Sequence, residues 1–300
     1  MNGDETSVAH AAALIRAGRL VAFPTETVYG LGANALDPAA VERIFAAKRR
    51  PRNSPLIVHV DSTAMARSLS AAWPETAEKL ARRYWPGPLT LVVPKHSTVP
   101  DIVTAGLDTV GLRMPAHPLA LALIRAARVP IAAPSANRFT ELSPTEAQDV
   151  PPQLADFVLD GGPARVGIES TVLSLAGAPR LLRPGVIPLP EIECLIGPLT
   201  IAGTPAAEEA HLSPGMHLRH YRPATPLFLI APGDPLPPGR GAWLRLGREM
   251  PADPRDYAAA LYRTLHRLDA QHLEWIAAEC PPETPEWAGV LDRLRKAAAS

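Results

Sequence analysis

The segment spanning residues 23–60 limits the possible folds of this chain most, because it joins two predicted strands through a polar turn and a basic helix end. Apolar runs over residues 20–23 and 56–60 predict the two strands. A helix is predicted to begin at Pro38, because Asp37 is a favourable N-cap and proline is favoured at the first helical position. Strands that alternate with helices predict an α/β fold, in which ligands bind where strands end.

Four cations gather at the end of this helix, at Lys48, Arg49, Arg50 and Arg52. Lys48 falls at the next position of the apolar helix face, and we expect both Lys48 and Arg50 to end exposed elements. One interpretation is a solvated charge run that also favours the helix dipole. The other is an anion site, because the stiff loop over residues 51–55 holds the cations beside the polar turn. Composition does not separate the two.

Composition narrows the class of protein. The 300 residues are 47% apolar, which is ample for a core, so the 35 prolines indicate stiff loops. The formal net charge is zero, so any anion site must be local. Cys194 and Cys280 lack metal-site or CxxC spacing and are expected to be reduced. Because residues 1–18 carry Asp4 and Glu5, and no apolar run is long enough to cross a bilayer, we expect a cytoplasmic protein without a signal peptide.

Polar side chains also follow other predicted strands. Two strands are predicted to end at Arg113 and Arg183, each of which offers a possible anion contact. The predicted strand over residues 129–133 leads to Ser135 and Asn137, which point the same way if the chain stays extended. They could offer a hydroxyl and an amide to one ligand, or they could form an ordinary turn.

The chain is expected to divide into three parts. Residues 1–187 form a first α/β unit, and residues 226–300 form a smaller one. Residues 188–225 have few periodic segments and many prolines, glycines and alanines, which predicts an inter-domain linker. A linker should be bland, yet a polar cluster lies at the end of this one, and long loops of this kind are more often functional or disordered than idle. A lid over a site is one option. The cluster consists of His217, Arg219, His220, Tyr221 and Arg222.

Taken together, these motifs resemble the Sua5/YciO/YrdC family, in particular its two-domain Sua5 type. The similarity covers nearly all of residues 7–225 in the same order and, more loosely, residues 281–298. The segments that carry it are FPTETVYGLGANA (23–35), KRRPRNSPLIVHV (48–60), WPGPLTLV (85–92), TVGLRMPAHP (109–118), APSANRF (133–139), ESTVL (169–173), LLRPG (181–185) and SPGMHLRHYRP (213–223).

The resemblance implies a YrdC-like twisted mixed α/β sheet with a large basic cavity, followed by a linker and a small Rossmann-like C-terminal α/β domain. It also implies an L-threonylcarbamoyladenylate synthase, in which L-threonine and bicarbonate form a carbamate that attacks the α-phosphate of ATP and releases pyrophosphate. A downstream tRNA threonylcarbamoyl-transferase complex would then modify adenosine 37 of tRNAs that read ANN codons. ATP is therefore an expected substrate, with Mg²⁺ bound through its phosphates.

The same resemblance implies roles for individual residues. Lys48 and Arg50 are the expected catalytic residues, and with Ser135 and Asn137 they match the nucleotide-binding tetrad of the family. Further positions expected to contact ATP are Ser54, Thr109, Ser143, Arg183 and Tyr221. Arg113 would pair with the carboxylate of threonine, for which a guanidinium fork is well shaped. The positions expected to contact threonine are Thr27, His59, Arg113, Ala133 and Ser170.

The chain departs from the family pattern at Arg222, where alanine is usual. It also carries Arg52 in the loop after the basic helix end, and this arginine is expected to add a phosphate contact. The implied chemistry needs charge neutralisation, positioning and exclusion of water more than a covalent nucleophile. A double-stranded RNA or tRNA-binding module without catalysis is the main alternative, although aromatic residues are only 5% of the chain. A carbamoyl-adenylate-forming module for hydrogenase maturation, which would carry zinc-finger cysteines, and a scaffold of the tRNA-modifying complex are also open.

Overall fold

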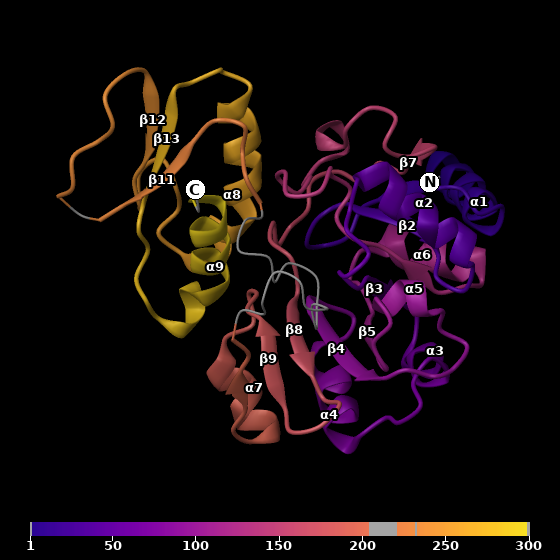
Figure 1. Cartoon of the computed structure of the whole chain (residues 1–300). Coiled ribbons are helices and arrows are strands. Elements are labelled where there is room, and N and C mark those ends of the chain that lie inside the picture. The colour runs from indigo at the N-terminus through magenta and orange to yellow at the C-terminus, as the bar shows by residue number, and fades with distance from the viewer. Residues whose placement is uncertain (1, 204–220, 232, 299–300) are drawn as a thin grey trace.

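The computed structural model describes residues 2–203, 221–231 and 233–298. It shows two α/β units, a larger N-terminal one and a smaller C-terminal one, which pack together (Figure 1). Ten strands of the described residues form one mixed sheet, which confirms the expected fold class. These strands are β1 (Val21–Phe23), β2 (Gly30–Asn34), β3 (Ile57–His59), β4 (Leu89–Pro94), β5 (Thr109–Arg113), β6 (Ile131–Ala132), β7 (Phe157–Val158), β8 (Thr171–Ser174), β9 (Arg180–Arg183) and β10 (Thr200–Ile201).

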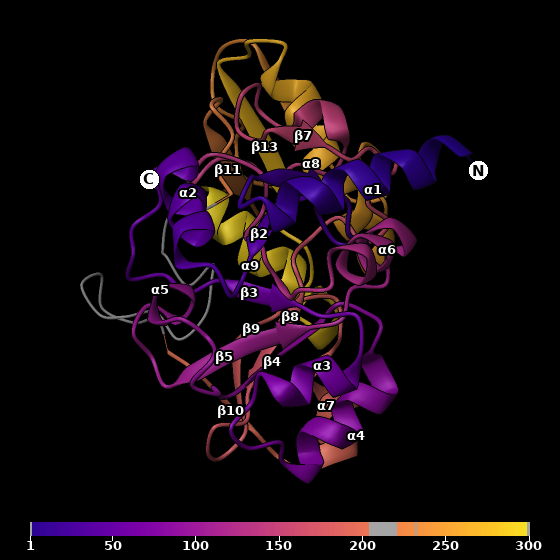
Figure 2. The ribbon, with the colours of Figure 1, turned by 90° about the vertical axis from the view of Figure 1, so that its right-hand side faces the viewer.

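Helices cover this sheet, and the first of them, α1, packs directly on α6. The helices are α1 (Asn2–Arg16), α2 (Pro38–Lys48), α3 (Thr63–Ser68), α4 (Glu75–Tyr84), α5 (Asp101–Thr104), α6 (Pro118–Ala127), the short 3₁₀ helix η1 (Ala147–Asp149) and α7 (Leu189–Ile196). Helix α1 lies beside α6 (Figure 2), where Ile15 and Leu123 are fully buried in a shared apolar cluster. This packing supports the strands whose ends form the candidate site.

The order of strands in the large sheet is β10-β9-β8-β4-β5-β3-β6-β2-β1-β7, so β3 lies between β5 and β6. Strands β3 and β5 are parallel, and their register places His59 opposite Arg113. Strand β6 runs antiparallel to β3, with Ile131 opposite His59. The ends of β3 and β5 therefore lie side by side, whereas the chain leaves β6 beside the start of β3, where the N–H of Ala133 donates to the carbonyl of Ile57 at 2.9 Å.

Helix α2 begins and ends as its sequence predicts. The Asp37 carboxylate accepts hydrogen bonds from the backbone N–H groups of Ala39 and Ala40, at 2.9 and 3.3 Å. Arg49 ends the helix in the left-handed conformation, with φ of 52°. The preceding residue, Lys48, lies on the buried face and is only 1% exposed. The expectation that Lys48 ends an exposed element is therefore wrong, because the apolar face of α2 continues to its last residue.

The expected linker over residues 188–225 is wrong in its first part. Helix α7 occupies Leu189–Ile196, and β10 extends the large sheet by pairing in parallel with β9. Two of the prolines that suggested a linker, Pro188 and Pro190, lie at the start of α7, where proline is compatible with a helix. Of the polar cluster at the end of this segment, His217, Arg219 and His220 lie outside the described residues.

The C-terminal unit is a small parallel sheet with two long helices. It comprises β11 (Leu227–Ile230), β12 (Gly241–Leu244), α8 (Pro254–Asp269), β13 (Trp275–Glu279), the 3₁₀ helix η2 (Pro285–Trp287) and α9 (Ala288–Ala298). Strand β13 lies in the centre and pairs in parallel with β11 and β12. No helix of the described residues has the length and apolar character needed to cross a bilayer.

The two units share one apolar cluster. Val28, Leu142 and Ile168 of the large unit are buried against residues of α8 and α9, including Leu261 and Leu294. The interface is therefore a continuous core rather than a polar contact between independent domains.

Candidate active site

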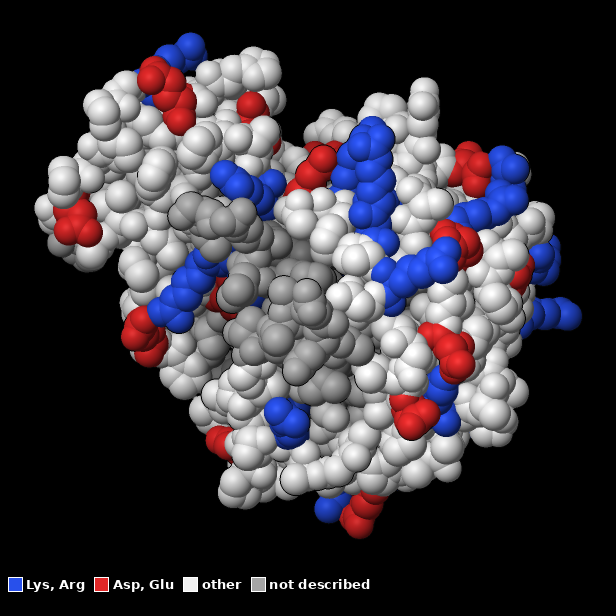
Figure 3. All heavy atoms as spheres, viewed as in Figure 1, with Lys and Arg blue, Asp and Glu red and all other residues white. Residues whose placement is uncertain are grey.

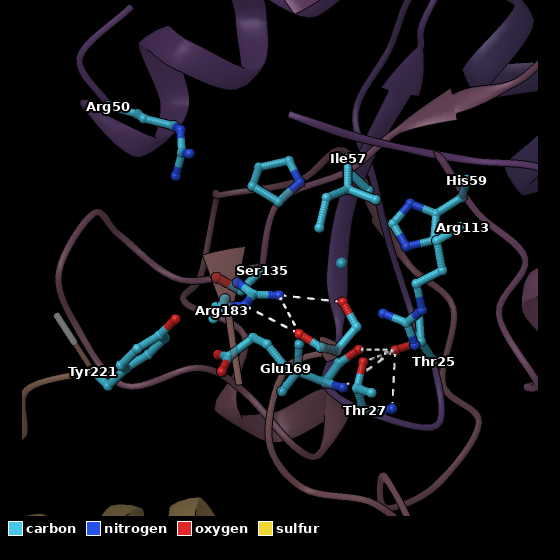
Figure 4. Close-up of a pocket in the computed structure, with 15 residues that line it drawn as sticks. Thr25, Thr27, Arg50, Ile57, His59, Arg113, Ser135, Glu169, Arg183 and Tyr221 are labelled. Atoms are coloured by element: carbon cyan, nitrogen blue, oxygen red, sulfur yellow. Dashed lines mark hydrogen bonds between the residues drawn. The ribbon is translucent and has the colours of Figure 1, made fainter. Parts of the chain in front are cut away.

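A cavity opens where strands of the large sheet end beside the turn that follows β1 (Figure 4). Figure 4 shows His59, Arg113 and the threonines of the turn on one side, with Arg50 and Tyr221 on the opposite side. The cavity is lined by Thr25, Thr27, Val28, Gly30, Arg50, Ile57, His59, Arg113, Ala133, Pro134, Ser135, Glu169, Ser170, Arg183 and Tyr221. Apart from Glu169, the charged side chains in this lining are cationic, so the cavity suits an anion.

A buried ion pair forms the first side of the cavity. The guanidinium of Arg113 lies 2.7 Å from the carboxylate of Glu26, and both side chains are about 5% exposed or less. The backbone N–H of Ala116 donates to Glu26 at 3.0 Å. These contacts fix the direction of the Arg113 fork, and the remaining donors of arginine can bind a carboxylate.

His59 lies beside this pair in a neutral form. Burial and then the charge of Arg113 lower the pKa of His59 to about 3. Its ring meets Phe23 edge to face, with 5.8 Å between ring centroids. Among the described residues, its buried Nδ1 atom has no hydrogen-bond partner. Because buried polar atoms are normally satisfied, this nitrogen is a candidate ligand contact.

Hydroxyl groups complete the same side. The hydroxyls of Thr25 and Thr27 are hydrogen-bonded at 2.8 Å, and Thr25 also donates to the carbonyl of Val28 at 2.6 Å. The hydroxyl of Ser170 lies 2.8 Å from that of Thr90. A tight turn and a strand start thus present fixed hydroxyls beside a guanidinium.

Arg50 forms the opposite side. Its guanidinium donates to the Ser54 hydroxyl at 2.5 Å and to the carbonyl of Pro55 at 3.1 Å. No carboxylate within the described ranges pairs with Arg50, and its buried Nε has no hydrogen-bond partner there. Burial, with a further contribution from the charge of Arg183, lowers the pKa of Arg50 to about 10, which leaves it charged at neutral pH. A buried cation of this kind favours an anionic ligand.

Lys48 acts behind the cavity wall. Its ammonium donates to the carbonyl of Ser135 at 2.6 Å, to the carbonyl of Asn137, and to the Asn137 side-chain oxygen at 3.2 Å. The Ser135 hydroxyl also donates to that oxygen, at 2.5 Å. Burial and then the charge of Arg50 lower the pKa of Lys48. The two segments that carry these residues therefore meet through direct hydrogen bonds.

Arg183, Glu169 and Tyr221 complete the lining near Arg50. Arg183 donates to the carbonyl of Ser170 at 2.9 Å and to its hydroxyl at 3.2 Å. Burial and the charge of Glu169 raise the pKa of Tyr221 to about 12. Although burial opposes ionisation of Glu169, the charges of Arg293 and Arg183 hold the pKa of Glu169 below its ordinary value.

Comparison with known proteins identifies the family. A family model described as telomere recombination, Sua5_yciO_yrdC, matches residues 13–185. This chain belongs to the Sua5/YciO/YrdC family. A second model, described as the C-terminal domain of threonylcarbamoyl-AMP synthase, matches residues 187–299, which assigns the chain to the two-domain Sua5 type.

Several relatives resemble this Sua5-type chain over nearly its whole length. Threonylcarbamoyl-AMP synthase of Pyrococcus abyssi is 43% identical, and the match covers 98% of this chain and 94% of that protein. The Bacillus subtilis protein of the same name is 42% identical, with 99% and 94% covered. A crystal structure of P. abyssi Sua5 complexed with L-threonine matches with a TM-score of 0.91 at 41% identity, and covers 98% of this chain and 94% of that one.

Most of the residues that the family resemblance singled out meet at one cavity. Its lining includes all five candidate threonine positions and four of the candidate ATP positions. The threonine positions are Thr27, His59, Arg113, Ala133 and Ser170, and the ATP positions are Arg50, Ser135, Arg183 and Tyr221. Since these residues lie on many separate segments, their convergence is a property of the fold.

The other candidate ATP positions do not line this cavity. Lys48, Asn137, Ser54 and Ser143 contact residues that do, and each is at most 2% exposed. Thr109 lines a small neighbouring cavity, which shares Ile57 with the first.

The basic cluster after α2 splits in two. Arg50 points inward and is 7% exposed, so the expectation that it ends an exposed element is also wrong. The side chain of Arg52 is 72% exposed and pairs with Glu42 at 2.6 Å, which does not support the expected phosphate contact. Because Arg49 ends the helix in the left-handed conformation, the chain changes direction there, and the side chains of Arg50 and Arg52 face opposite ways.

Sequence reasoning missed three charged residues of the site, namely Glu26, Glu169 and Arg293. Glu26 and Glu169 lie inside segments that resemble the family, so only their roles were overlooked. Arg293 lies in α9, where the resemblance to the family is only loose, and it is 1% exposed. Among the described residues, no group of three or more histidines, cysteines or carboxylates could hold a metal ion.

Proposed function

We propose that this protein is an L-threonylcarbamoyladenylate synthase, which makes threonylcarbamoyl-AMP and pyrophosphate from L-threonine, bicarbonate and ATP. The observation that carries the proposal is the convergence of nine residues, from Thr27 to Tyr221, on one mostly cationic cavity. The relatives that match nearly the whole chain and are called threonylcarbamoyl-AMP synthases support it.

The side of the cavity with Arg113 is the proposed threonine site. Arg113 would bind the threonine carboxylate, while Glu26 holds its guanidinium in place. Neutral His59, Thr27 and Ser170 would contact the polar groups of the amino acid. The ion pair limits the cost of keeping Arg113 buried before substrate binds.

The side with Arg50 is the proposed ATP site. Arg50 and Arg183 would hold the phosphates, and Lys48 would act by fixing Ser135 and Asn137 or by exchanging one of its acceptors for a phosphate oxygen. Tyr221 would close over the nucleotide. Mg²⁺ would enter with ATP and be bound through its phosphates, since metal-bridged phosphate charge is the common arrangement in such transfers.

The proposed reaction has two steps. The threonine nitrogen adds to carbon dioxide formed from bicarbonate and loses a proton, which gives a carbamate; the proton and the hydroxide left by bicarbonate form water. A carbamate oxygen then attacks the α-phosphorus of ATP, the bond to the bridging oxygen breaks, and pyrophosphate leaves with that bond's electrons. Fixed cations and exclusion of water favour this attack, because both reactants are anions and the carbamate is unstable in water.

The product would be used by a transferase complex that modifies adenosine 37 of ANN-decoding tRNAs, and we place the reaction in the cytoplasm. Direct RNA binding finds no support on the face seen in Figure 3, where cationic and anionic side chains are interspersed. A broad basic surface would be expected of an RNA-binding module.

A direct assay tests the proposal. The purified protein is incubated with ATP, Mg²⁺, L-threonine and bicarbonate, and threonylcarbamoyl-AMP is sought by mass spectrometry together with released pyrophosphate. Both products should appear only when threonine and bicarbonate are present. Pyrophosphate release that persists without threonine would contradict the substrate assignment.

A further inference from the structure

The C-terminal unit places one arginine at the wall of the candidate active site. The Nε atom of Arg293, in α9, donates to the Glu169 carboxylate at 2.7 Å, and Nη2 donates to the Glu169 carbonyl at 3.2 Å. A third donor reaches the carbonyl of Pro184 at 2.9 Å. Arg293 is 1% exposed, so this is an internal contact between the two units.

Glu169 is the one carboxylate in the described lining of the cavity. Left alone, its charge would repel the phosphates of ATP, or it would pair with Arg183 and withdraw that cation from them. Arg293 offsets this charge from behind the wall. Ser143 at 2.6 Å and Tyr262 of α8 at 3.2 Å donate to the same carboxylate.

Arg293 also supports the tyrosine that lines the cavity. Its guanidinium carbon lies 5.1 Å from the ring centroid of Tyr221, in a cation–π contact. The Tyr221 ring is also 5.9 Å from that of Tyr262. One side chain of the C-terminal unit therefore contacts two residues of the proposed nucleotide site.

A close approach of two glycines sets the position of Arg293. A Cβ atom on Gly289 would lie 2.4 Å from the carbonyl oxygen of Gly185, so α9 can approach the end of β9 only because this residue is glycine. Arg293 follows one helical turn later, on the same face. The helix is thus held close enough to the large unit for Arg293 to form its ion pair with Glu169.

We infer that Arg293 is a positioning residue of the nucleotide site, through which the C-terminal unit neutralises Glu169 and orients Tyr221 for ATP binding. The inference rests on the proposed function for the identity of the ligand. It gives the C-terminal unit a role in the reaction, although that unit contributes no side chain to the described cavity lining.

The test compares ATP affinity in variants of the full chain by titration calorimetry. Arg293→Met should weaken ATP binding by at least about tenfold, as expected when one member of a buried charge pair is lost. Arg295→Met on the same helix is the matched control, because that side chain is 55% exposed and pairs with Glu283; its affinity should equal that of the wild type. Circular dichroism and thermal unfolding confirm that each variant is folded.

Charge neutralisation predicts a specific rescue. The double variant with Glu169→Gln and Arg293→Met should recover ATP affinity to within about threefold of the wild type, because the buried charge is removed with its partner. Asp292, the other carboxylate that pairs with Arg293 at 2.7 Å, keeps its ion pair with Lys296 at 2.8 Å in that variant. Glu169→Gln alone should bind ATP at least as well as the wild type. A purely structural role for Arg293 would show no rescue.

Two results would overturn the inference while leaving the proposed function intact. One is equal ATP affinity of Arg293→Met and Arg295→Met. The other is weaker ATP binding by Glu169→Gln alone, a test that can be made even if Arg293→Met fails to fold. If the wild-type protein does not bind ATP, the proposed function and this inference both fall. The two failures are therefore distinguishable.

Discussion

At the scale of single residues, the site depends on which polar side chains are buried. Arg50 and Arg52 are two residues apart, yet one is 7% exposed at the cavity and the other lies on the surface. A buried cation without a carboxylate partner is unfavourable unless a ligand or a hydrogen-bond network stabilises it. This difference suggests that Arg50 is retained for binding and that Arg52 contributes little.

Replacing Arg50 with methionine should separate these roles. Arg50→Met is expected to weaken ATP binding by about 2–5 kcal/mol, the usual effect of losing a buried charged contact. Arg52→Met is the control, because an exposed ion pair contributes about 1 kcal/mol or less. Titration calorimetry measures both. Similar losses in the two variants would reject the placement of Arg50 at the phosphates.

His59 should leave a signature in the pH dependence of stability. Its pKa is about 3 in the folded protein and 6.5 in the reference state, so the unfolded chain takes up a proton first. The stability that neutral His59 contributes is present above pH 6.5 and is lost as pH falls toward 3, by up to about 1.4 kcal/mol per pH unit. Denaturant unfolding of His59→Asn should show a smaller loss in this window.

The exposed His272 provides the control for that measurement. Its φ of 50° is tolerated by asparagine, so His272→Asn makes the same substitution at the surface. If His59→Asn and the wild type lose stability in parallel between pH 6.5 and 3, the buried neutral histidine is not the cause.

At the scale of elements, the position of α9 is the feature that joins the C-terminal unit to the site. Gly289 allows the helix to touch the carbonyl of Gly185, just after β9, and Arg293 follows on the same face. Small residues permit this approach because backbone atoms meet without intervening side chains.

Gly289→Ala should therefore disturb docking. The new methyl group would meet the Gly185 carbonyl at 2.4 Å, so α9 must move, at a cost of about 1–3 kcal/mol that outweighs the gain in helix propensity. Gly177→Ala is the matched control, because its Cβ would meet nothing within 4 Å. Thermal unfolding and ATP titration report both effects. A Gly289→Ala protein with wild-type stability and affinity would contradict this account.

At the scale of the whole molecule, the two units behave as one body in this structure. Val28 and Ile168 of the large unit are buried in the cluster formed with α8 and α9, and Tyr262 and Arg293 cross the interface to Glu169. The large unit therefore relies on the smaller one to cover apolar surface and to balance a buried carboxylate.

Truncation after Gly203 tests this dependence, since it keeps β10 and removes Tyr221 together with the C-terminal unit. Residues 1–203 are expected to retain the mixed sheet, to bind ATP at least about tenfold more weakly, and to expose the apolar cluster to a dye such as ANS. Circular dichroism and calorimetry measure these outcomes. Unchanged nucleotide affinity would argue against any role of the C-terminal unit at the site.

Much of the fold follows from local patterns. Helix α2 begins at Pro38, and strands β5 and β9 end at Arg113 and Arg183, as predicted, because caps and apolar runs mark them clearly. Helix α7 and strand β10 were overlooked, because short elements near prolines have weak local signals. Family resemblance supplied the candidate site residues, and the structure shows nine of them lining one cavity.

Long-range packing decided the rest. Glu169 and Arg293 are 124 residues apart, and Glu26 pairs with an arginine on a strand that no local pattern links to it. The direction of each cation after α2 also depends on what surrounds it. Periodicity and capping report only interactions between near neighbours in the chain, whereas the charge balance of a buried cavity is set by contacts that exist only once distant segments have packed.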